Sequence, residues 1–571
     1  MHLLYTCLMG NRNIIEQLQQ EAQAYSGIKE LETISRDVGS FSSLPIQPVY
    51  TAFKQLNPQE ASKLLSKSSQ EQREAFRQLD LWDRDIVSVK EFEYWLETVI
   101  CTKDLPLIAE FSLSEEFAVY LKSICHISTF DVEDPQYPEH NYYFLTDDTL
   151  LLIEYGEDYD YGDQLKLLLK TIYGELGVDK AYAYLFKILV DQHSNFEEES
   201  YRRKNDNLRN FGFVDYYEAI EKLTPFPSYK RIDSFIQKKL EKVFSITDLD
   251  VINQNNIIPG NFLTLHDISN DSLNKELLKV DGHASSSFFR FNFVRLFNAV
   301  VVTSNSGLGN MKVIRELNKE IYNFLNLGIE YIQSLSDKPK VALLKYFDFF
   351  QLFQIGQSLV FLEKKSLKSS FSKNDLNLAD EKFLGELINK NLECWYERVP
   401  SIRIQGEVKE IKDLSTYLDF KSQVLFTNEF LPFVSLFKET YQKLLDDNLI
   451  NDSYYLNYNC EDINLETILI SSIVNFHFSQ DPDQKKLGVS LENLKGFISV
   501  YSFNYKDFNR ASFEKLQSLV SEYTKTYGLN EVTKIESFLC ELLIESFTGY
   551  EFEQMEDAEY EFFGGPLILN S

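Results

Sequence analysis

The most informative segment of the chain reads Asn195-Phe-Glu-Glu-Glu-Ser-Tyr-Arg-Arg-Lys-Asn-Asp-Asn-Leu-Arg-Asn-Phe-Gly-Phe-Val-Asp215. Its local signals predict two consecutive helices. Asn195 is placed to accept hydrogen bonds from the free amides of a first helix, and Glu198 completes a capping box with it. Gly212 suits the left-handed conformation that ends a helix, and Asp215 suits the N-cap of the next one. We therefore expect one helix to end near Gly212 and a second to begin at Asp215.

The first of these helices carries two different faces. Tyr201, Leu208 and Phe211 recur at helical spacing and predict a buried stripe. A polar stripe on the same helix, taken with the acid that follows it, forms a candidate polar cleft: Glu198, Arg202, Asn205, Arg209 and Asp215. Pairing along the helix, as between Glu198 and Arg202, is the commoner use of such a pattern. The sequence leaves both interpretations open, a structural set of ion pairs or the lining of a functional cleft.

Composition limits the classes of function. The chain has 571 residues, enough for three or four units of about 150 residues each. The formal net charge of −30 repels phosphate backbones, so we expect no nucleic-acid binding. The 6 cysteines have no close pairs, which excludes a disulfide framework and favours reduced thiols. No cofactor motif is present, and the expected location is the cytoplasm.

No segment reads as a membrane span or a signal peptide. The opening residues lack a basic region, and either Met1 or Met9 is the start. The most apolar long run, residues 341–363, carries a lysine, an aspartate and glutamines along its length. Polar groups spread in this way favour a buried helix of a water-soluble protein.

The N-terminal third shows helix starts at close spacing. The capping signals are Asn57 before Pro58, Ser69 with Gln72, Ser88 with Glu91, and Ser112 with Glu115. Because no such short helix buries its apolar face alone, we expect neighbours to stack as hairpins. An alternation of apolar and polar residues at 142–155 predicts one small β-hairpin. The predicted fold class is therefore mainly all-α, with stacked short helical hairpins in an N-terminal superhelical unit followed by further helical units.

The expected domain boundaries follow shifts in composition. They are residues 1–43 as a lead-in with one helix, 44–227 as the superhelical domain, 228–365 as a central helical domain, 366–378 as a linker, 379–550 as a mainly helical C-terminal domain, and 551–571 as an acidic aromatic tail. Residues 230–242 form a basic amphipathic pattern, which predicts a helix with a solvated face.

The segment 131–163 holds eleven acids and no lysine or arginine. Its end, Asp158-Tyr-Asp-Tyr-Gly-Asp163, is superficially like a calcium loop. With Gly162 in the sixth position of that loop, Leu168 occupies the place of the bidentate acid. A solvated acidic loop is therefore favoured, with a divalent-cation site as the alternative.

A set of landmark residues lies between residues 44 and 365. It comprises Leu79-Asp-Leu-Trp-Asp-Arg-Asp85 with Phe92 and Trp95, Phe144-Leu-Thr-Asp-Asp148, Glu198-Glu-Ser-Tyr-Arg202, Asn205, Leu208, Gly212-Phe213, Asp215 and Glu218-Ala219. Two further runs in this range are Asn326-Leu-Gly-Ile-Glu-Tyr331 and Leu352-Phe-Gln-Ile-Gly356. In these landmarks the chain resembles a bacterial family catalogued as domain of unknown function 6178. The runs Leu56-Asn-Pro-Gln-Glu60, Leu64-Leu65 and Ser69-Gln-Glu-Gln72 are also similar to the N-terminal cytosolic domain of MgtE-type magnesium channels. That second resemblance implies stacked short helices and does not imply transport.

Three functions stay open at this point. The leading hypothesis is a non-catalytic protein-interaction or scaffold protein with a protein partner, because the sequence offers helical surfaces and no recognisable catalytic motif. The first alternative is divalent-cation sensing through residues 131–163. The second is an enzyme with a polar cleft around Glu198 and Arg202. The oligomeric state is left open.

Overall fold

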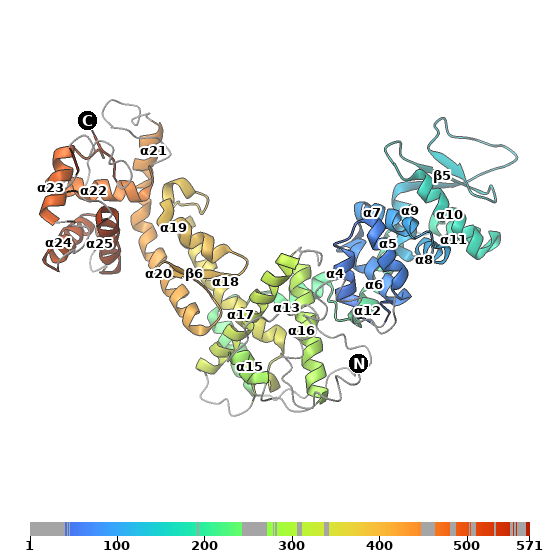
Figure 1. The fold of residues 1–571 in the computed structure, drawn as a ribbon, viewed down its shortest axis with the longest axis horizontal. Helices are drawn as coiled ribbons and strands as arrows, with labels where there is room; N and C mark the ends of the chain where they lie inside the picture. Colours follow the sequence, from blue (N-terminus) through green and yellow to red (C-terminus); the bar gives the residue numbers. More distant parts are fainter. Residues whose placement is uncertain are drawn as a thin grey trace. The chain divides into compact units, whose positions relative to one another are not determined.

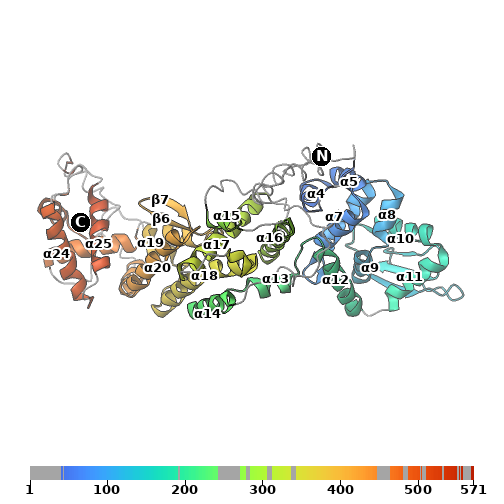
Figure 2. The same cartoon turned by 90° about the horizontal axis from the view of Figure 1, so that it is seen from below.

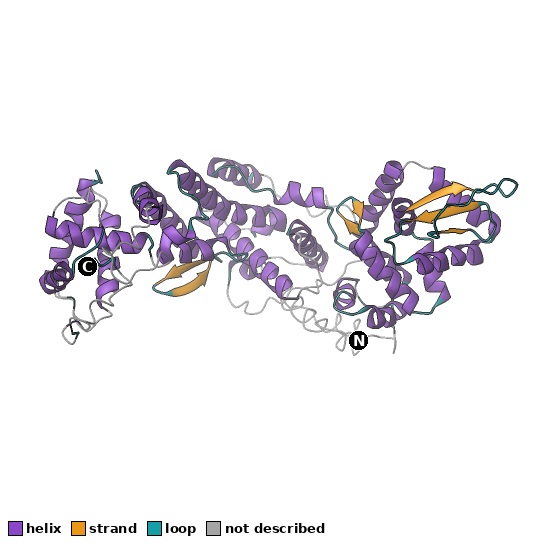
Figure 3. Cartoon of the chain, turned by 90° about the horizontal axis from the view of Figure 1, so that it is seen from above, coloured by secondary structure: helices purple, strands orange, loops and turns teal. Residues whose placement is uncertain are grey.

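The chain is mainly helical, as predicted (Figures 1 and 3). It divides into two compact units. One unit comprises Met1–Phe226 with Lys230–Gln357, and the other Pro227–Tyr229 with Ser358–Ser571. The structure is a computed structural model that describes residues 40–42, 44, 46–190, 193–241, 271–277, 279, 283–304, 311–335, 342–446, 463–479, 487–501, 503, 510–529, 533–548, 552, 555–556 and 567–570. The expected helix of the lead-in, near residues 12–24, lies outside the described residues.

Short helices open the first unit, and their starts follow the capping chemistry of the sequence. They are α4 (Ile46–Phe53), α5 (Pro58–Lys67), α6 (Gln70–Asp80), α7 (Val89–Cys101), α8 (Leu105–Ser112) and α9 (Glu115–Ile124). The Asn57 side chain accepts a hydrogen bond from the backbone of Glu60 at 3.0 Å, and Ser69 forms the predicted capping box with Gln72. These two predicted starts are confirmed.

The predicted start at Ser112 was wrong by two residues. Ser112 lies in the last turn of α8, where its hydroxyl donates to the carbonyl of Ile108 at 2.7 Å. Ser114 caps α9 instead, by accepting from the amide of Phe117. A serine side chain can bond to a backbone group either in the last turn of a helix or at the start of the next. The sequence pattern therefore did not show that Ser112 ends one helix and Ser114 begins the next.

Aromatic side chains fill the core of these helices. Phe53 and Trp95 lie with ring centroids 5.0 Å apart, and Phe92 packs against Phe111 at 5.1 Å. All four side chains are almost completely buried. Since none of the short helices buries its apolar face alone, this shared core is what stabilises them.

The predicted β-hairpin is confirmed and belongs to a larger sheet. Its strands are β4 (Tyr143–Leu145) and β5 (Leu151–Tyr155), and the unexpected β3 (Cys125–Thr129) pairs with β5 in the antiparallel order β3-β5-β4. Two further hairpins were not predicted: β1 (Trp82–Asp83) with β2 (Ile86–Val87), and β6 (Ser401–Ile404) with β7 (Glu407–Glu410). Strands this short carry too little alternation to be recognised in a sequence.

The first unit continues through further helices, several of them longer (Figure 2). They are α10 (Gly162–Leu176), α11 (Val178–Val190), α12 (His193–Arg209), α13 (Tyr216–Leu223), α14 (Tyr229–Leu240), α15 (Ser272–Leu277), α16 (His283–Thr303), α17 (Met311–Leu335) and the first part of α18 (Phe349–Lys373), which follows a short 3-10 turn at Leu343–Lys345. Helix α12 begins at His193, so Asn195 lies inside the helix and the prediction that it is the N-cap was wrong. A capping signal places a helix start only to within about two residues.

The second unit is also helical and contains one hairpin among its described residues. Its elements are α19 (Glu381–Tyr396), β6 and β7, α20 (Leu414–Ser435), α21 (Lys438–Asp446), α22 (Leu465–Ser479), α23 (Leu491–Tyr501), α24 (Arg510–Thr526) and α25 (Thr533–Thr548). Residues 366–373, within the stretch expected to be a linker, continue α18 as helix. Near the C-terminus Leu569 pairs with Val489, and the amide of Ile568 donates to Ser471 at 2.7 Å. Within the expected tail, residues 567–569 are therefore buried in this unit.

Candidate functional site

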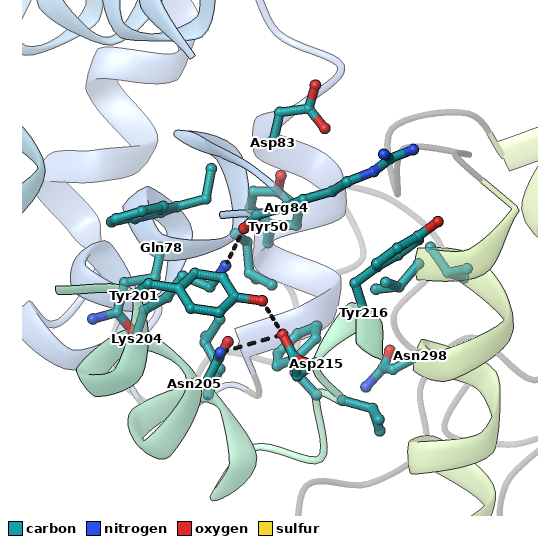
Figure 4. A pocket seen from close by; sticks show the side chains of 17 residues that line it. Tyr50, Gln78, Asp83, Arg84, Tyr201, Lys204, Asn205, Asp215, Tyr216 and Asn298 are labelled. Carbon is teal, nitrogen blue, oxygen red and sulfur yellow. Dashed lines mark hydrogen bonds between the residues drawn. The ribbon is translucent and has the colours of Figure 1, made fainter. Parts of the chain in front are cut away.

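A pocket of about 510 Å³ lies inside the first unit, against α12 (Figure 4). Its walls come from segments that are far apart in the sequence: α4, the end of α6, the β1–β2 hairpin, α12, the turn before α13, and α16. The lining residues are Tyr50, Gln78, Leu79, Trp82, Asp83, Arg84, Tyr201, Lys204, Asn205, Leu208, Phe213, Val214, Asp215, Tyr216, Asn298, Val301 and Val302. The volume is in the range that small-molecule sites occupy in proteins.

The turn between α12 and α13 positions one wall of the pocket. Gly212 has a φ of +80°, and the amide of Phe213 donates to the carbonyl of Leu208 at 3.2 Å, which closes the helix as predicted. Asp215 then caps α13 by accepting from the amide of Tyr217 at 3.0 Å, which was also predicted. The chain reverses over these few residues, so the start of α13 faces the side of α12.

Asp215 accepts hydrogen bonds from three neighbouring donors. The Tyr201 hydroxyl donates to its Oδ1, and the Asn205 side-chain amide donates to the same oxygen at 3.2 Å (Figure 4). The other carboxylate oxygen receives the capping bond from Tyr217. The negative charge also lies at the N-terminus of α13, where the helix dipole stabilises it. Asp215 therefore fixes the pocket wall.

The structure separates the residues of the candidate polar cleft. Asn205 and Asp215 line the pocket together, whereas Glu198 and Arg202 are exposed and do not line it. Among the described residues no ion pair joins Glu198 to Arg202, and Arg209 lies 3.5 Å from Glu218 on α13. The spacing placed Glu198, Arg202, Asn205 and Arg209 on one polar face of the helix, but α12 presents only the edge of that face to the pocket.

Sequence reasoning missed Lys204, which is the most unusual residue of the site. Its side chain is buried, with 9% of the residue exposed. The ammonium group donates to the backbone carbonyl of Arg84 at 3.2 Å and lies over the rings of Tyr201 at 4.4 Å and Trp82 at 5.2 Å. Within the part of the chain that the structure describes, no carboxylate lies within ion-pair distance of it. The available signal was its spacing, because Lys204 stands between Tyr201 and Leu208 on the apolar stripe.

Burial lowers the pKa of Lys204 to about 8, although the charges of Asp215, Glu116 and Asp85 oppose the shift. An unfolded chain keeps this lysine protonated up to its usual pKa near 10.4. Between about pH 8 and 10.4 the unfolded state therefore binds more protons, and the stability contributed by this residue rises with pH.

Substitution of Lys204 by methionine should remove that rise. Between pH 7.5 and 9.5 the free energy of unfolding of the wild-type protein should increase relative to that of the variant by on the order of 2 kcal/mol. Urea unfolding at the two pH values measures this difference. Lys90→Met, at an exposed position on α7, is the matched control and should follow the wild-type profile. Identical pH profiles for wild type and Lys204→Met would show that the lysine is not desolvated.

The β1–β2 hairpin supplies a second cation at the pocket. Arg84 is exposed, has a φ of +59°, and places its guanidinium over the ring of Tyr216 at 4.8 Å. The tight turn brings both the Arg84 side chain and its carbonyl to the pocket, the first at the rim and the second at Lys204. A positive φ strains a non-glycine residue, and such strain is frequent at binding sites.

Helix α16 closes the opposite wall through a buried amide. Asn298 donates to the carbonyl of Gly212 at 2.7 Å and accepts from the Gln47 side chain at 2.8 Å. These bonds join α16 to the α12–α13 turn and to α4, so three segments of the pocket are fixed relative to one another.

Some acids of the segment 131–163 serve the sheet and its turns. Asp148 accepts from Thr146 at 2.6 Å and from Tyr173 at 2.9 Å, and Glu154 lies 3.3 Å from His140. A search of the described residues, which include this whole segment, finds no group of three or more His, Cys, Asp or Glu able to hold a metal ion. None of the described helices is both long and apolar enough to cross a membrane.

Comparison with known proteins places the chain in one family. No curated protein and no solved structure gives a significant match. The model of a family of unknown function, DUF6178, matches residues 12–495, which include α12, the pocket and most of the second unit. The chain therefore belongs to the DUF6178 family.

Proposed function

We propose that this chain is a non-catalytic cytoplasmic interaction protein, and that α11 docks an acidic amphipathic helix of a protein partner. The observation that carries the proposal is an apolar stripe on the exposed side of α11. Val178, Phe186 and Val190 are 54%, 38% and 62% exposed, and Tyr182 stacks on Phe186 with ring centroids 5.6 Å apart. We call these four residues the α11 stripe.

The α11 stripe is separate from the face that the helix buries. Ala181, Leu185 and Ile188 pack into the unit, against α9 and α10. At about 100° per residue, the stripe covers a further arc of roughly 120° beside that buried face. A helix that serves only its own core needs one apolar face, and a second exposed one is typical of a surface that binds another protein.

Charge selects the kind of partner. Lys180 and Lys187 are exposed and border the free edge of the α11 stripe. Neither lysine has an ion-pair partner among the described residues. Screening limits the repulsion from the rest of this acidic chain to about 8 Å at physiological salt. The charges that a docked helix meets are therefore those beside the stripe, the two lysines and the exposed Asp179 within its arc. A helix with leucine-like residues on one face and acids beside them complements both features.

The remaining alternatives receive less support from the placement of their residues. An enzyme built around Glu198 and Arg202 needs these side chains in a cavity, and both are exposed outside the pocket. Cation sensing needs clustered oxygen ligands, whereas the acids of residues 131–163 that contact other groups serve the sheet. Free thiols suit the proposed compartment, since Cys101, Cys125, Cys394 and Cys540 are unbonded.

Photo-crosslinking in the native host tests the docking surface. A photoreactive phenylalanine analogue replaces Phe186 in one strain and Val408, an exposed residue of the β6–β7 hairpin, in the control strain. The proposal predicts a crosslink from position 186 to an acidic amphipathic helix of another protein, and none from position 408. Mass spectrometry of the crosslinked peptide identifies the segment.

A peptide of the captured segment then provides the quantitative measurement. Its affinity should fall at least tenfold for Phe186→Asp and for Lys187→Glu, and cooperative thermal unfolding of both variants checks that they remain folded. A crosslink to residues of this same chain, or to a basic or non-helical segment, would overturn the proposal. So would equal crosslinking from positions 186 and 408.

A further inference from the structure

We propose that the pocket beside α12 binds a small molecule through a carboxylate or phosphate group, which Lys204 and Arg84 hold. This site lies away from the α11 stripe, on other elements of the first unit, and the inference does not depend on the docking of a protein partner. The pocket, the buried lysine and the arginine at the rim carry it together.

The first step is the unused hydrogen-bonding capacity of the Lys204 ammonium group. The group has three N–H donors, and the acceptor it reaches among the described residues is the single carbonyl of Arg84. Its other neighbours are the faces of Tyr201 and Trp82, which stabilise a cation but accept hydrogen bonds only weakly. Burying an ammonium with so few oxygen ligands is costly unless a ligand supplies the missing ones.

The second step concerns the acids of the pocket. Asp83 and Asp215 also line it and give it a balanced formal charge. Asp215 is occupied by Tyr201, Asn205 and the backbone of Tyr217, as described above. Asp83 is exposed on the hairpin, where water solvates it. The acids therefore leave the ammonium of Lys204 without a direct counterion inside the pocket.

The third step is the remainder of the cavity. Arg84 stands at the rim over Tyr216, and its guanidinium is the second donor for a planar or tetrahedral anion. Val301 and Val302 on α16 supply an apolar wall, and the amides of Gln78 and Asn298, which bond to neighbouring protein groups, fix the polar part of the lining. Few polar groups that converge within a partly apolar cavity of this size are typical of small-molecule sites. The predicted ligand class is an organic acid or phosphate monoester with an apolar or aromatic body.

Thermal unfolding of the full-length protein tests this with the simplest probes. Sodium phosphate and sodium acetate are titrated at constant ionic strength, with sodium chloride as the reference, because screening alone changes stability. The proposal predicts a saturable rise in Tm with at least one of the two anions beyond that of chloride. Saturation by phosphate at lower concentration assigns the phosphate class, and the reverse assigns the carboxylate class.

Variants test whether the rise in Tm comes from anion binding at this pocket. Lys204→Met should weaken the response at least tenfold, Lys204→Arg should keep it within about threefold, and Arg84→Gln should reduce it in part. The control Lys90→Met should respond as wild type. For wild type, anion affinity should also decline above about pH 8, where Lys204 loses its proton, whereas Lys204→Arg should show no such decline.

Two results would overturn the inference. One is that neither anion exceeds chloride in the wild-type protein. The other is that Lys204→Met, folded as judged by its cooperative unfolding, responds like the wild type. Because Arg84 is exposed, Arg84→Gln keeps the fold and gives a second reading even if the methionine variant unfolds.

Discussion

Gly356→Ala should lower the free energy of unfolding by more than about 4 kcal/mol, although alanine is the better helix former by about 1 kcal/mol. Gly356 lies in α18, where its backbone crosses that of α17. A Cβ atom at this position would stand 2.0 Å from the carbonyl oxygen of Phe324, and one at Gly328 would stand 2.1 Å from that of Leu352. The two helices must separate to admit a methyl group, and this loosens contacts such as that between Phe324 and Phe353.

Urea unfolding of three variants checks this expectation. Gly174→Ala on α10 is the matched control, because a Cβ there meets nothing within 4 Å, and it should stabilise the protein by about 0.5 to 1 kcal/mol. The double variant Gly328→Ala with Gly356→Ala should lose less than the sum of the single losses, since one separation of the helices admits both methyl groups. If Gly356→Ala stabilised the protein like Gly174→Ala, the close crossing would be refuted.

Asp80→Ala should destabilise the protein by about 3 to 5 kcal/mol. Asp80 ends α6 and accepts from the Trp95 indole at 2.7 Å, from the Tyr50 hydroxyl at 3.1 Å and from the Lys54 ammonium at 2.5 Å. One carboxylate thus joins α4, α6 and α7. Burial raises its pKa, and the charge of Lys54 opposes that shift. Removal of the carboxylate leaves these donors without their shared acceptor in the aromatic core.

Calorimetric unfolding of Asp80→Ala, Asp80→Asn and a surface control measures this contribution. The asparagine variant keeps one acceptor oxygen, and its loss should be smaller, about 1 to 3 kcal/mol. The control Asp206→Ala, at an exposed position on α12, should change stability by no more than about 0.5 kcal/mol. A loss at Asp80 no larger than that at Asp206 would mean that the carboxylate does not organise the first helices.

Much of the helical fold followed from chemistry that acts over a few residues. Asn57 and Ser69 cap their helices as predicted, and Gly212 and Asp215 close one helix and open the next. Each of these residues satisfies backbone groups within three or four positions of itself, so its role can be predicted without knowledge of the rest of the chain. The same signals were less exact at Ser112 and Asn195, because a capping pattern places a helix start only to within about two residues.

The site followed from the sequence only in part. The polar stripe lies on α12, and two residues of the candidate polar cleft, Asn205 and Asp215, do line the pocket. Glu198 and Arg202 point elsewhere because the packing of α12 against α6 and α9 fixes its rotation, and helical spacing alone does not state that rotation. Lys204 was overlooked for the same reason, since a lysine on an apolar stripe is assigned to water until its neighbours are known.

The sequence alone indicated where several helices begin, where α12 ends, and that short helices would share a core. The tertiary structure alone shows that Trp82 and Arg84, more than a hundred positions earlier in the chain, contact Lys204. It also decided that the α17 and α18 backbones meet at glycines. The physical reason is range: capping and periodicity act between near neighbours, whereas burial, desolvation and close helix crossing depend on which distant segments the fold brings into contact.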